Sequence, residues 1–525
     1  MVDFEVFEKE EYSVCIEDSD LYQFHEYIKE NPLVNFVSYT EEICFKKSGQ
    51  MQKNKFKDIP RLKWLILLRV IPLNIFNMPF YEYSREIIDL LNRERNEYNI
   101  SFKKYRPDIS KMTSMDPLTS HPLSQSASNP WNEQQKNSEL LDEIWKDITR
   151  TFSERQLFSE IGTRQLLQRV LFTWTRENPE FGYKQGMNEL AAVLFLVNFS
   201  QKSKFTNGES QSTEKMEKNN NPITNLIFTG DSIEADTFIM FKSLMSTFGI
   251  KYMFQSPDDL QSNEQKLKTD DFKLPIIHRC NNIYSILENI DKELYLHLVK
   301  EHGIEPQILF LRWIRLLFSR EFSNLNDSLI NWELMFCDSL KNGSKYTADN
   351  LKMKISALSE QKNEKICLIV ESIMPIFNFV AVSILESKRD KILSMDYNQT
   401  LKFLVNQSSL TVDPLAIIQN ANKLSCFVSN NFLDSNSERK VICKNNGRNN
   451  FFDHRDIHYS QIKNNAMISL GNLKGSKVSD SLLEITRNLH TSANNIDDIE
   501  LLKSTIFSSC KELLLIGKVL KERNI

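Results

Sequence analysis

The sequence predicts an all-α protein, and three observations carry this prediction. Apolar residues recur at helical spacing, as in 139–148 and 166–174, where each stripe occupies one helical face. The chain has 13 glycines among its 525 residues, too few for a protein built from many tight hairpins. Boundary signals separate the stripes, because Pro179 disfavours the helical conformation at Asn178. We therefore expect a large multi-helix domain.

The segment after Gly182 is expected to be the central helix of that domain. Gly182 permits a turn, and residues 188–199 are apolar on nearly every side. This stretch is too short to span a bilayer, which takes about 20 residues. A longer apolar stretch, 366–385, carries Glu371 near its centre, so we interpret it as a buried helix, with a membrane span as the alternative.

Composition and charge exclude several classes of protein. The 65 basic residues nearly balance 69 acidic ones, and the net charge of -4 gives no global field that would attract nucleic acid or an anionic membrane. The eight cysteines form no Cys-x-x-Cys pair, which argues against a zinc ribbon and favours reduced thiols. The acidic N-terminus lacks the features of a signal peptide. We expect a cytoplasmic protein that binds no nucleic acid.

Changes in pattern divide the chain into four expected regions. They are an N-terminal extension, a helical domain, a largely disordered linker and an amphipathic helical segment, at 1–55, 56–405, 406–480 and 481–525. Flexible polar insertions are expected within the domain, at 201–221, 261–271 and 341–364. The final segment could dock on the domain, pair with a partner helix or touch a membrane.

Two short motifs place an arginine and a glutamine near the ends of helices. Arg150 ends the run Ile-Trp-Lys-Asp-Ile-Thr-Arg, and Gln185 lies in the loop that follows Pro179. An arginine delivered in trans can raise the rate of a GTPase by about 10³- to 10⁵-fold, and a glutamine amide can orient the attacking water. Taken alone, each residue would more often be a solvated charge or a loop amide, so the hypothesis depends on the pair.

Asp147 lies three residues before Arg150 and could support it. A charge-assisted hydrogen bond would keep the guanidinium extended, and a plain surface carboxylate is the alternative. Residues 471–480 contain glycine and lysine at the wrong spacing for a phosphate-binding loop, so we expect no nucleotide site or cofactor of the chain's own. His297 and His302 lack an acidic neighbour at ligand spacing, and no metal site is expected.

These motifs resemble the TBC-domain GTPase-activating proteins that act on Rab GTPases. The family's Ile-x-x-Asp-x-x-Arg and Tyr-x-Gln-Gly-Met elements are matched here by Ile144, Asp147 and Arg150, and by Tyr183, Gln185, Gly186 and Met187, with Asn188 next. The resemblance covers residues 56–405. It implies a wholly helical domain in which Arg150 and Gln185 act as dual fingers on a Rab-family partner, which brings GTP and Mg²⁺.

The first helix of the matched region departs from the family's pattern. The family usually has an arginine four residues before a tryptophan, whereas this chain has Pro60 four residues before Trp64. Arg61 lies three residues before the tryptophan. Because helical positions three and four apart are both neighbours, Arg61 could still lie near the same face.

Further stretches look like the endosomal subgroup typified by TBC domain family member five. They include 121–131, 293–298 and 305–322. This resemblance implies a role in endosomal membrane traffic, with peripheral attachment to endosomal membranes through partners. It also implies retromer or another endosomal sorting coat as a second partner. The alternative function is a TBC-fold scaffold that mainly recruits such a coat.

Overall fold

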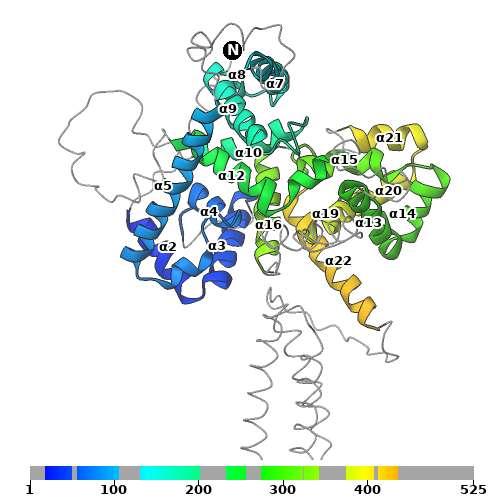
Figure 1. Ribbon diagram of the computed structural model, residues 1–525. Coiled ribbons are helices and arrows are strands. Elements are labelled where there is room, and N and C mark those ends of the chain that lie inside the picture. Colours follow the sequence, from blue (N-terminus) through cyan, green and yellow to red (C-terminus); the bar gives the residue numbers. More distant parts are fainter. Residues whose placement is uncertain are drawn as a thin grey trace, which may run out of the picture. The chain divides into compact units, whose positions relative to one another are not determined.

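The computed structural model describes most of the N-terminal four-fifths of the chain. The described ranges are 18–49, 56–105, 130–200, 232–255, 274–322, 324–341, 374–406 and 412–434. Within them the chain forms helices joined by turns and loops, with no strand, which confirms the predicted fold class (Figure 1). The polar insertions lie outside these ranges except for Lys341, and so does the whole of 481–525.

Twenty helical elements are described, and their bounds follow the chain. The first ten are α2 (Asp18–Glu30), α3 (Pro32–Lys47), α4 (Pro60–Leu67), the 3-10 helix η1 (Leu73–Asn77), α5 (Phe80–Tyr105), α7 (Pro130–Arg150), α8 (Gln156–Ser159), α9 (Ile161–Glu177), α10 (Met187–Phe199) and α12 (Ile233–Thr247). The others are the 3-10 helix η5 (Ile250–Phe254), α13 (Pro275–Ile290), α14 (Lys292–Leu296), the π-helical turn η7 (His297–Glu301), α15 (Pro306–Leu316), α16 (Leu325–Lys341), α19 (Ile376–Ser387), α20 (Arg389–Leu393), α21 (Tyr397–Val405) and α22 (Pro414–Asp434).

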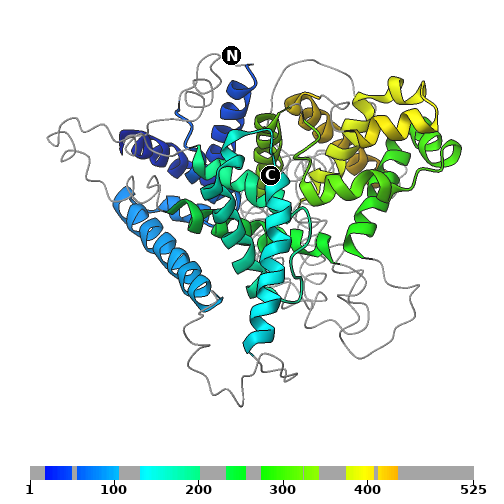
Figure 2. The ribbon, with the colours of Figure 1, turned by 90° about the horizontal axis from the view of Figure 1, so that it is seen from above.

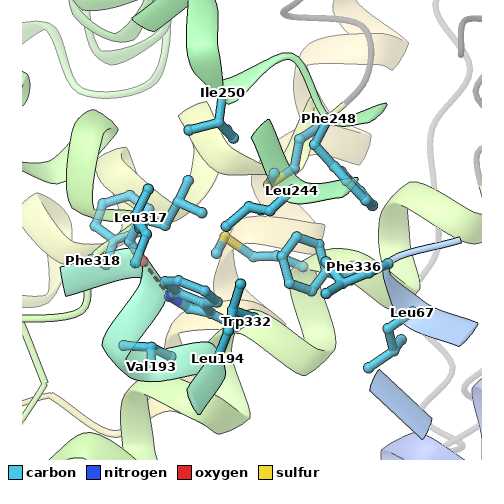
Figure 3. Close-up of a cluster of buried hydrophobic side chains, with 14 of the residues drawn as sticks. Leu67, Val193, Leu194, Leu244, Phe248, Ile250, Leu317, Phe318, Trp332 and Phe336 are labelled. Atoms are coloured by element: carbon cyan, nitrogen blue, oxygen red, sulfur yellow. Dashed lines mark hydrogen bonds between the residues drawn. The ribbon is translucent and has the colours of Figure 1, made fainter. Parts of the chain in front are cut away.

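Helix α10 lies at the centre of the core, as its apolar sequence predicts. Its residues from Met187 to Asn198 are buried except for Glu189, which is partly exposed. A helix that is apolar all round must be covered on every side, and α10 packs against α4, α7, α9, α12 and α15. Figure 3 shows part of this core, where Val193 and Leu194 lie beside Trp332 of α16.

The two amphipathic stripes found in the sequence belong to α7 and α9. Ile144 and Ile148 of α7 are buried, as are Val170 and Trp174 of α9, and the two helices pack against each other. In Figure 2, α7 is the long cyan helix beside the teal helices. Helix α9 ends just before Asn178, where the following proline predicts its end. The end of α9 lies beside the start of α7, where Arg176 pairs with Glu133. The loop that follows returns to the end of α7, where the Tyr183 hydroxyl meets Asp147.

The described part of the expected N-terminal extension, 18–49, takes part in the core. Helix α3 packs against α16, and the carboxylate of Glu333 on α16 is buried between them. That carboxylate accepts hydrogen bonds from Cys44 Sγ at 3.2 Å, Lys63 Nζ at 2.9 Å and Trp64 Nε1 at 2.9 Å. The expected boundary at residue 55 is thus no break in packing between α3 and the helices that follow it.

A linker is expected from residue 406, and the structure differs over its first part. Residues 414–434 form α22, which packs against α13, α16 and α19. Leu415, Ile418 and Ala421 are buried at a spacing of three residues, so α22 presents one apolar stripe to the core. This stripe is short and adjoins asparagine-rich sequence, which hides its periodicity. The rest of the expected linker, beyond Asp434, lies outside the described residues.

The apolar stretch 366–385 is described only from Met374 onward. Its described part enters α19, which begins at Ile376 and is largely buried against α13 and α22. Within the ranges given above, no helix combines the length and the apolar character that a bilayer span requires. The described part of this stretch is therefore core helix, while Glu371 lies outside the described residues.

Candidate functional site

Arg150 is the last residue of α7, and its side chain is 61% exposed. Its Nη2 donates a hydrogen bond to Oδ1 of Asp147, three residues earlier on the same helix. The Asp147 side chain is only 8% exposed, so it is not the plain surface carboxylate of the alternative interpretation. A buried carboxylate thus holds an exposed guanidinium at the end of a helix.

Gln185 is exposed in the loop between α9 and α10, directly before Gly186. Gly186 has a φ of +105°, in the left-handed region that side chains disfavour. A Cβ atom at this position would lie 3.2 Å from Leu316 Cδ2 and 3.4 Å from Phe254 Cε1. The loop is therefore pressed against α15 and η5 in a conformation that requires glycine.

A hydrogen-bond network joins the end of α7 to this loop. The Tyr183 hydroxyl donates to Asp147 Oδ2 at 2.8 Å and lies 3.3 Å from Asn188 Oδ1. The same Asn188 oxygen accepts from the Gly186 amide at 2.9 Å. Asn188 Nδ2 donates to Thr151 Oγ1 at 2.7 Å, and Thr151 Oγ1 donates to the Asp147 carbonyl at 2.8 Å. The two sequence motifs thus meet in one connected structure.

The network is buried, which makes it stiff. Tyr183, Asn188 and Thr151 are all less than a tenth exposed, and Ile144 packs into the core one turn before Asp147. Burial, followed by the hydrogen bond to Asp147, raises the pKa of Tyr183, so its hydroxyl stays protonated and donates at neutral pH. Fully partnered buried networks of this kind fix one arrangement of their members.

The sequence-predicted site residues occupy three kinds of position in the structure. Asp147, Tyr183, Gly186 and Asn188 are members of the network, and Ile144 is a core residue beneath it. Arg150 and Gln185 project from its two ends as exposed side chains. Their joint action on a phosphoryl group stays a prediction.

Thr151 belongs to the network but is not among the predicted site residues. Its only signal in the sequence is its position directly after Arg150, because a threonine hydroxyl is an ordinary group at a helix end. The pairing with Asn188, 37 residues away in the sequence, could not be read from local periodicity.

Arg61, His297 and His302 make hydrogen bonds within the fold, away from the network described above. Arg61 is 1% exposed and donates to Asp236 on α12 and to Ser232 Oγ at 2.8 Å. His297 Nε2 lies 3.1 Å from the Ile392 carbonyl, and His302 Nε2 lies 3.2 Å from that of Met395. The expectation that neither histidine has an acidic neighbour is wrong for His297, because its Nδ1 lies 2.6 Å from Glu301 Oε2 one helical turn later. In the part of the chain that the structure describes, no three His, Cys, Asp or Glu side chains are grouped to hold a metal ion.

Comparison with known families matches residues 115–364 to the model of the Rab-GTPase-TBC domain. The chain contains a domain of this family. The matched range includes both motifs and lies inside the expected domain, 56–405. The hydrogen-bond network described above is therefore a feature of this TBC domain.

Several curated proteins are similar to this TBC domain. TBC1 domain family member 5 of Mus musculus is 32% identical over 305 residues, which cover 56% of this chain and 35% of that protein. TBC1 domain family member 13 of Mus musculus is 30% identical over 174 residues, covering 33% and 34%. GTPase-activating protein GYP1 of Saccharomyces cerevisiae is 24% identical over 305 residues, covering 56% and 38%. The chain spans about a third of the length of these relatives.

Proposed function

We propose that this chain is a GTPase-activating protein that stimulates GTP hydrolysis by a Rab-family small GTPase. The partner supplies GTP and Mg²⁺, and this chain contributes no cofactor. Arg150 stabilises the charge that develops on the transferring phosphoryl group, while Gln185 orients the attacking water. No covalent intermediate on this chain is needed.

The observation that supports this proposal is the single buried network with an exposed finger residue at each end. Catalytic groups must be held near their productive positions before the partner arrives, because disorder at that moment costs rate. Asp147 holds Arg150, and Asn188 holds the amide of Gly186 beside Gln185. The hydrogen bond to Asp147 uses one of the five N–H donors of the guanidinium, so others can face a phosphate.

The comparisons support the class of partner more than the place of action. GYP1 is named as a GTPase-activating protein, and the domain family is named for Rab GTPases. The endosomal role and the attachment to endosomal membranes from the cytoplasmic side rest on the resemblance to the endosomal subgroup. They are proposed on that ground alone.

Single-turnover hydrolysis by a panel of GTP-loaded Rab proteins tests the proposal. We expect the full chain to accelerate at least one Rab, and Arg150→Ala or Gln185→Ala to remove most of that acceleration, about 10³-fold for the arginine. Arg85→Ala is the matched control, because Arg85 is also exposed on a helix beside an aspartate, with Nε 4.0 Å from Asp89 Oδ2. Unchanged rates in both finger variants would remove the dual-finger mechanism.

Retromer or another sorting coat is proposed as a second partner on the same resemblance. The segment expected to recruit it, 481–525, lies outside the described residues. Deleting 497–525 should leave hydrolysis in solution intact and abolish endosomal recruitment if that segment carries it. Loss of hydrolysis on deletion would show that the segment serves the domain instead.

A further inference from the structure

Arg320 lies between α15 and α16 and contacts both segments that carry the fingers. Its Nε donates to Glu189 Oε2 at 2.7 Å, and its Cζ lies 4.3 Å from the centre of the Phe152 ring. Phe152 follows Arg150 by two residues, and Glu189 follows Gln185 by four. One planar cation therefore touches the turn after α7 and the first turn of α10.

These contacts are largely shielded from water. The side chains of Arg320 and Glu189 are 19% and 18% exposed, and Phe152 is 3% exposed. Phe152 has a φ of +43°, in the left-handed region, so the turn after Arg150 needs support from its surroundings to persist. An arginine over the ring supplies such support, because a desolvated cation is attracted to an aromatic face.

The backbone from which Arg320 projects is itself fixed. Leu317 and Phe318 both have left-handed φ values, +49° and +62°, which residues with side chains adopt only when their surroundings dictate it. Trp332 Nε1 donates to the Leu317 carbonyl at 2.7 Å, the dashed line in Figure 3. The Phe318 ring stacks on Phe377 at 4.4 Å. Arg320 thus acts from a rigid base that is distant in sequence from both motifs.

Leu316, at the end of α15, contacts the loop that carries Gln185. The Leu316 side chain lies against Gly186, so close that a Cβ there would come within 3.2 Å of its Cδ2. The end of α15 therefore limits the Gln185 loop at Leu316, while Arg320 holds the turn after Arg150 and the start of α10. Movement of one finger segment relative to the other would have to break one of these contacts.

We infer that Arg320 is a positioning residue that fixes the positions of Arg150 and Gln185 relative to each other. This inference rests on the proposed function and deepens it. The guanidinium serves because it can pair with a carboxylate in its plane while stacking a face on a ring, which an ammonium group does less well. Arg320 acts through Phe152 and Glu189, and needs no contact with the Rab or the nucleotide.

Single-turnover kinetics at varied protein concentration give the first test, on a Rab that responds to the full chain. Arg320→Gln should lower the maximal rate by about 10- to 100-fold, as expected for a displaced catalytic group. The half-saturating concentration should barely change, and Arg320→Lys should recover part of the rate. An unchanged maximal rate, or a loss confined to half-saturation as for a direct Rab contact, would overturn the inference.

The control for that test is Arg389→Gln. Arg389 on α20 also pairs with two carboxylates, donating from Nε to Asp291 Oδ2 at 2.6 Å and from Nη2 to Glu293. We expect its substitution to leave the maximal rate unchanged. An equal loss of rate in both variants would mean that Arg320 contributes only to general stability, and the inference would fail.

Hydrogen exchange of the full chain without any Rab gives a second test that does not depend on GTPase activation. In Arg320→Gln, amides in 148–155 and in 182–189 should exchange faster together, while those of α20 and α21 should not change. Unchanged exchange in either finger segment, or faster exchange throughout, would overturn the inference. If no Rab responds to the full chain, the proposed function fails, and this measurement still decides whether Arg320 couples the two segments.

Discussion

Two arginine–aspartate pairs in this protein share their chemistry and differ in their surroundings. Arg61 and Asp236 are 1% and 0% exposed, and Asp236 also accepts from Arg95 Nε at 2.7 Å. That carboxylate joins α4, α5 and α12. Arg150 pairs with Asp147 as well, but its side chain is 61% exposed. An arginine–aspartate pair therefore points to a functional site only when the guanidinium remains accessible to solvent and a third residue fixes the carboxylate, as Tyr183 fixes Asp147.

The buried pair should give the largest loss of stability. In Asp236→Asn the guanidinium groups of Arg61 and Arg95 lose their shared counter-charge inside the core, which should cost about 3 kcal/mol or more. Urea unfolding of the variant and the parent protein measures this. The matched change at the surface, Asp89→Asn, should cost less than about 1 kcal/mol. Similar small costs for both changes would erase the contrast between buried and exposed pairs.

The exposed pair should show its effect in rate instead of stability. Asp147→Asn keeps the side chain's shape but removes the charge that holds Arg150, so stimulated hydrolysis should fall by about 10- to 100-fold. Unfolding free energy should fall by only about 1 kcal/mol, because the amide oxygen can still accept from Tyr183. A variant that unfolds easily yet retains the full rate would reverse the roles assigned to this carboxylate.

A second cluster of paired charges, in which Lys63 is buried and Asp58 is partly exposed, extends the comparison to pH dependence. Burial alone would raise the pKa of Asp58, but Lys47 and Lys63 outweigh it and lower this pKa from 3.8 to about 2. Because the folded-state pKa is depressed, the stabilisation is complete above pH 3.8 and is lost as the pH falls toward 2. It amounts to about 2 kcal/mol. Unfolding free energy measured at pH 5 and at pH 2.5 should drop less in Asp58→Asn than in the parent, and equal drops would contradict this assignment.

The smallest effect is expected inside the finger network. Tyr183→Phe removes the hydroxyl that donates to Asp147 and should cost about 1 kcal/mol of stability. Stimulated hydrolysis should fall only a few-fold, because Arg150 keeps its own hydrogen bond to Asp147. The control is Tyr252→Phe, in a residue whose ring packs against Phe181 of the same loop at 5.5 Å. An equal effect of both substitutions on rate would mean that the hydroxyl of Tyr183 has no special part.

Local patterns in the sequence predict the helices around the site correctly. The largely apolar run 188–199 predicts the central position of α10, and Pro179 predicts the end of α9. The three-residue spacing of Asp147 and Arg150 predicts their pairing on α7, which the structure contains. These features depend on neighbours within one or two helical turns, which a single sequence displays directly.

Contacts between distant segments could not be predicted in this way. Arg320 lies 131 residues from Glu189, and no periodicity relates the two. Arg61 looks like a displaced member of a family motif, yet its position is set by Asp236, 175 residues away. Helix α22 could not be predicted from the sequence, because its apolar stripe is short. Pairing across the core depends on how helices pack, and the sequence of one helix does not contain that information.

The part played by α2 to α5 in the core limits how the protein can be shortened for expression. A fragment restricted to the matched range, 115–364, would lack the cations that neutralise Glu333 and Asp236. Two uncompensated carboxylates would then sit on freshly uncovered apolar surface, and such a fragment should aggregate. A truncated version meant for purification should therefore start ahead of Asp18 and extend past α22.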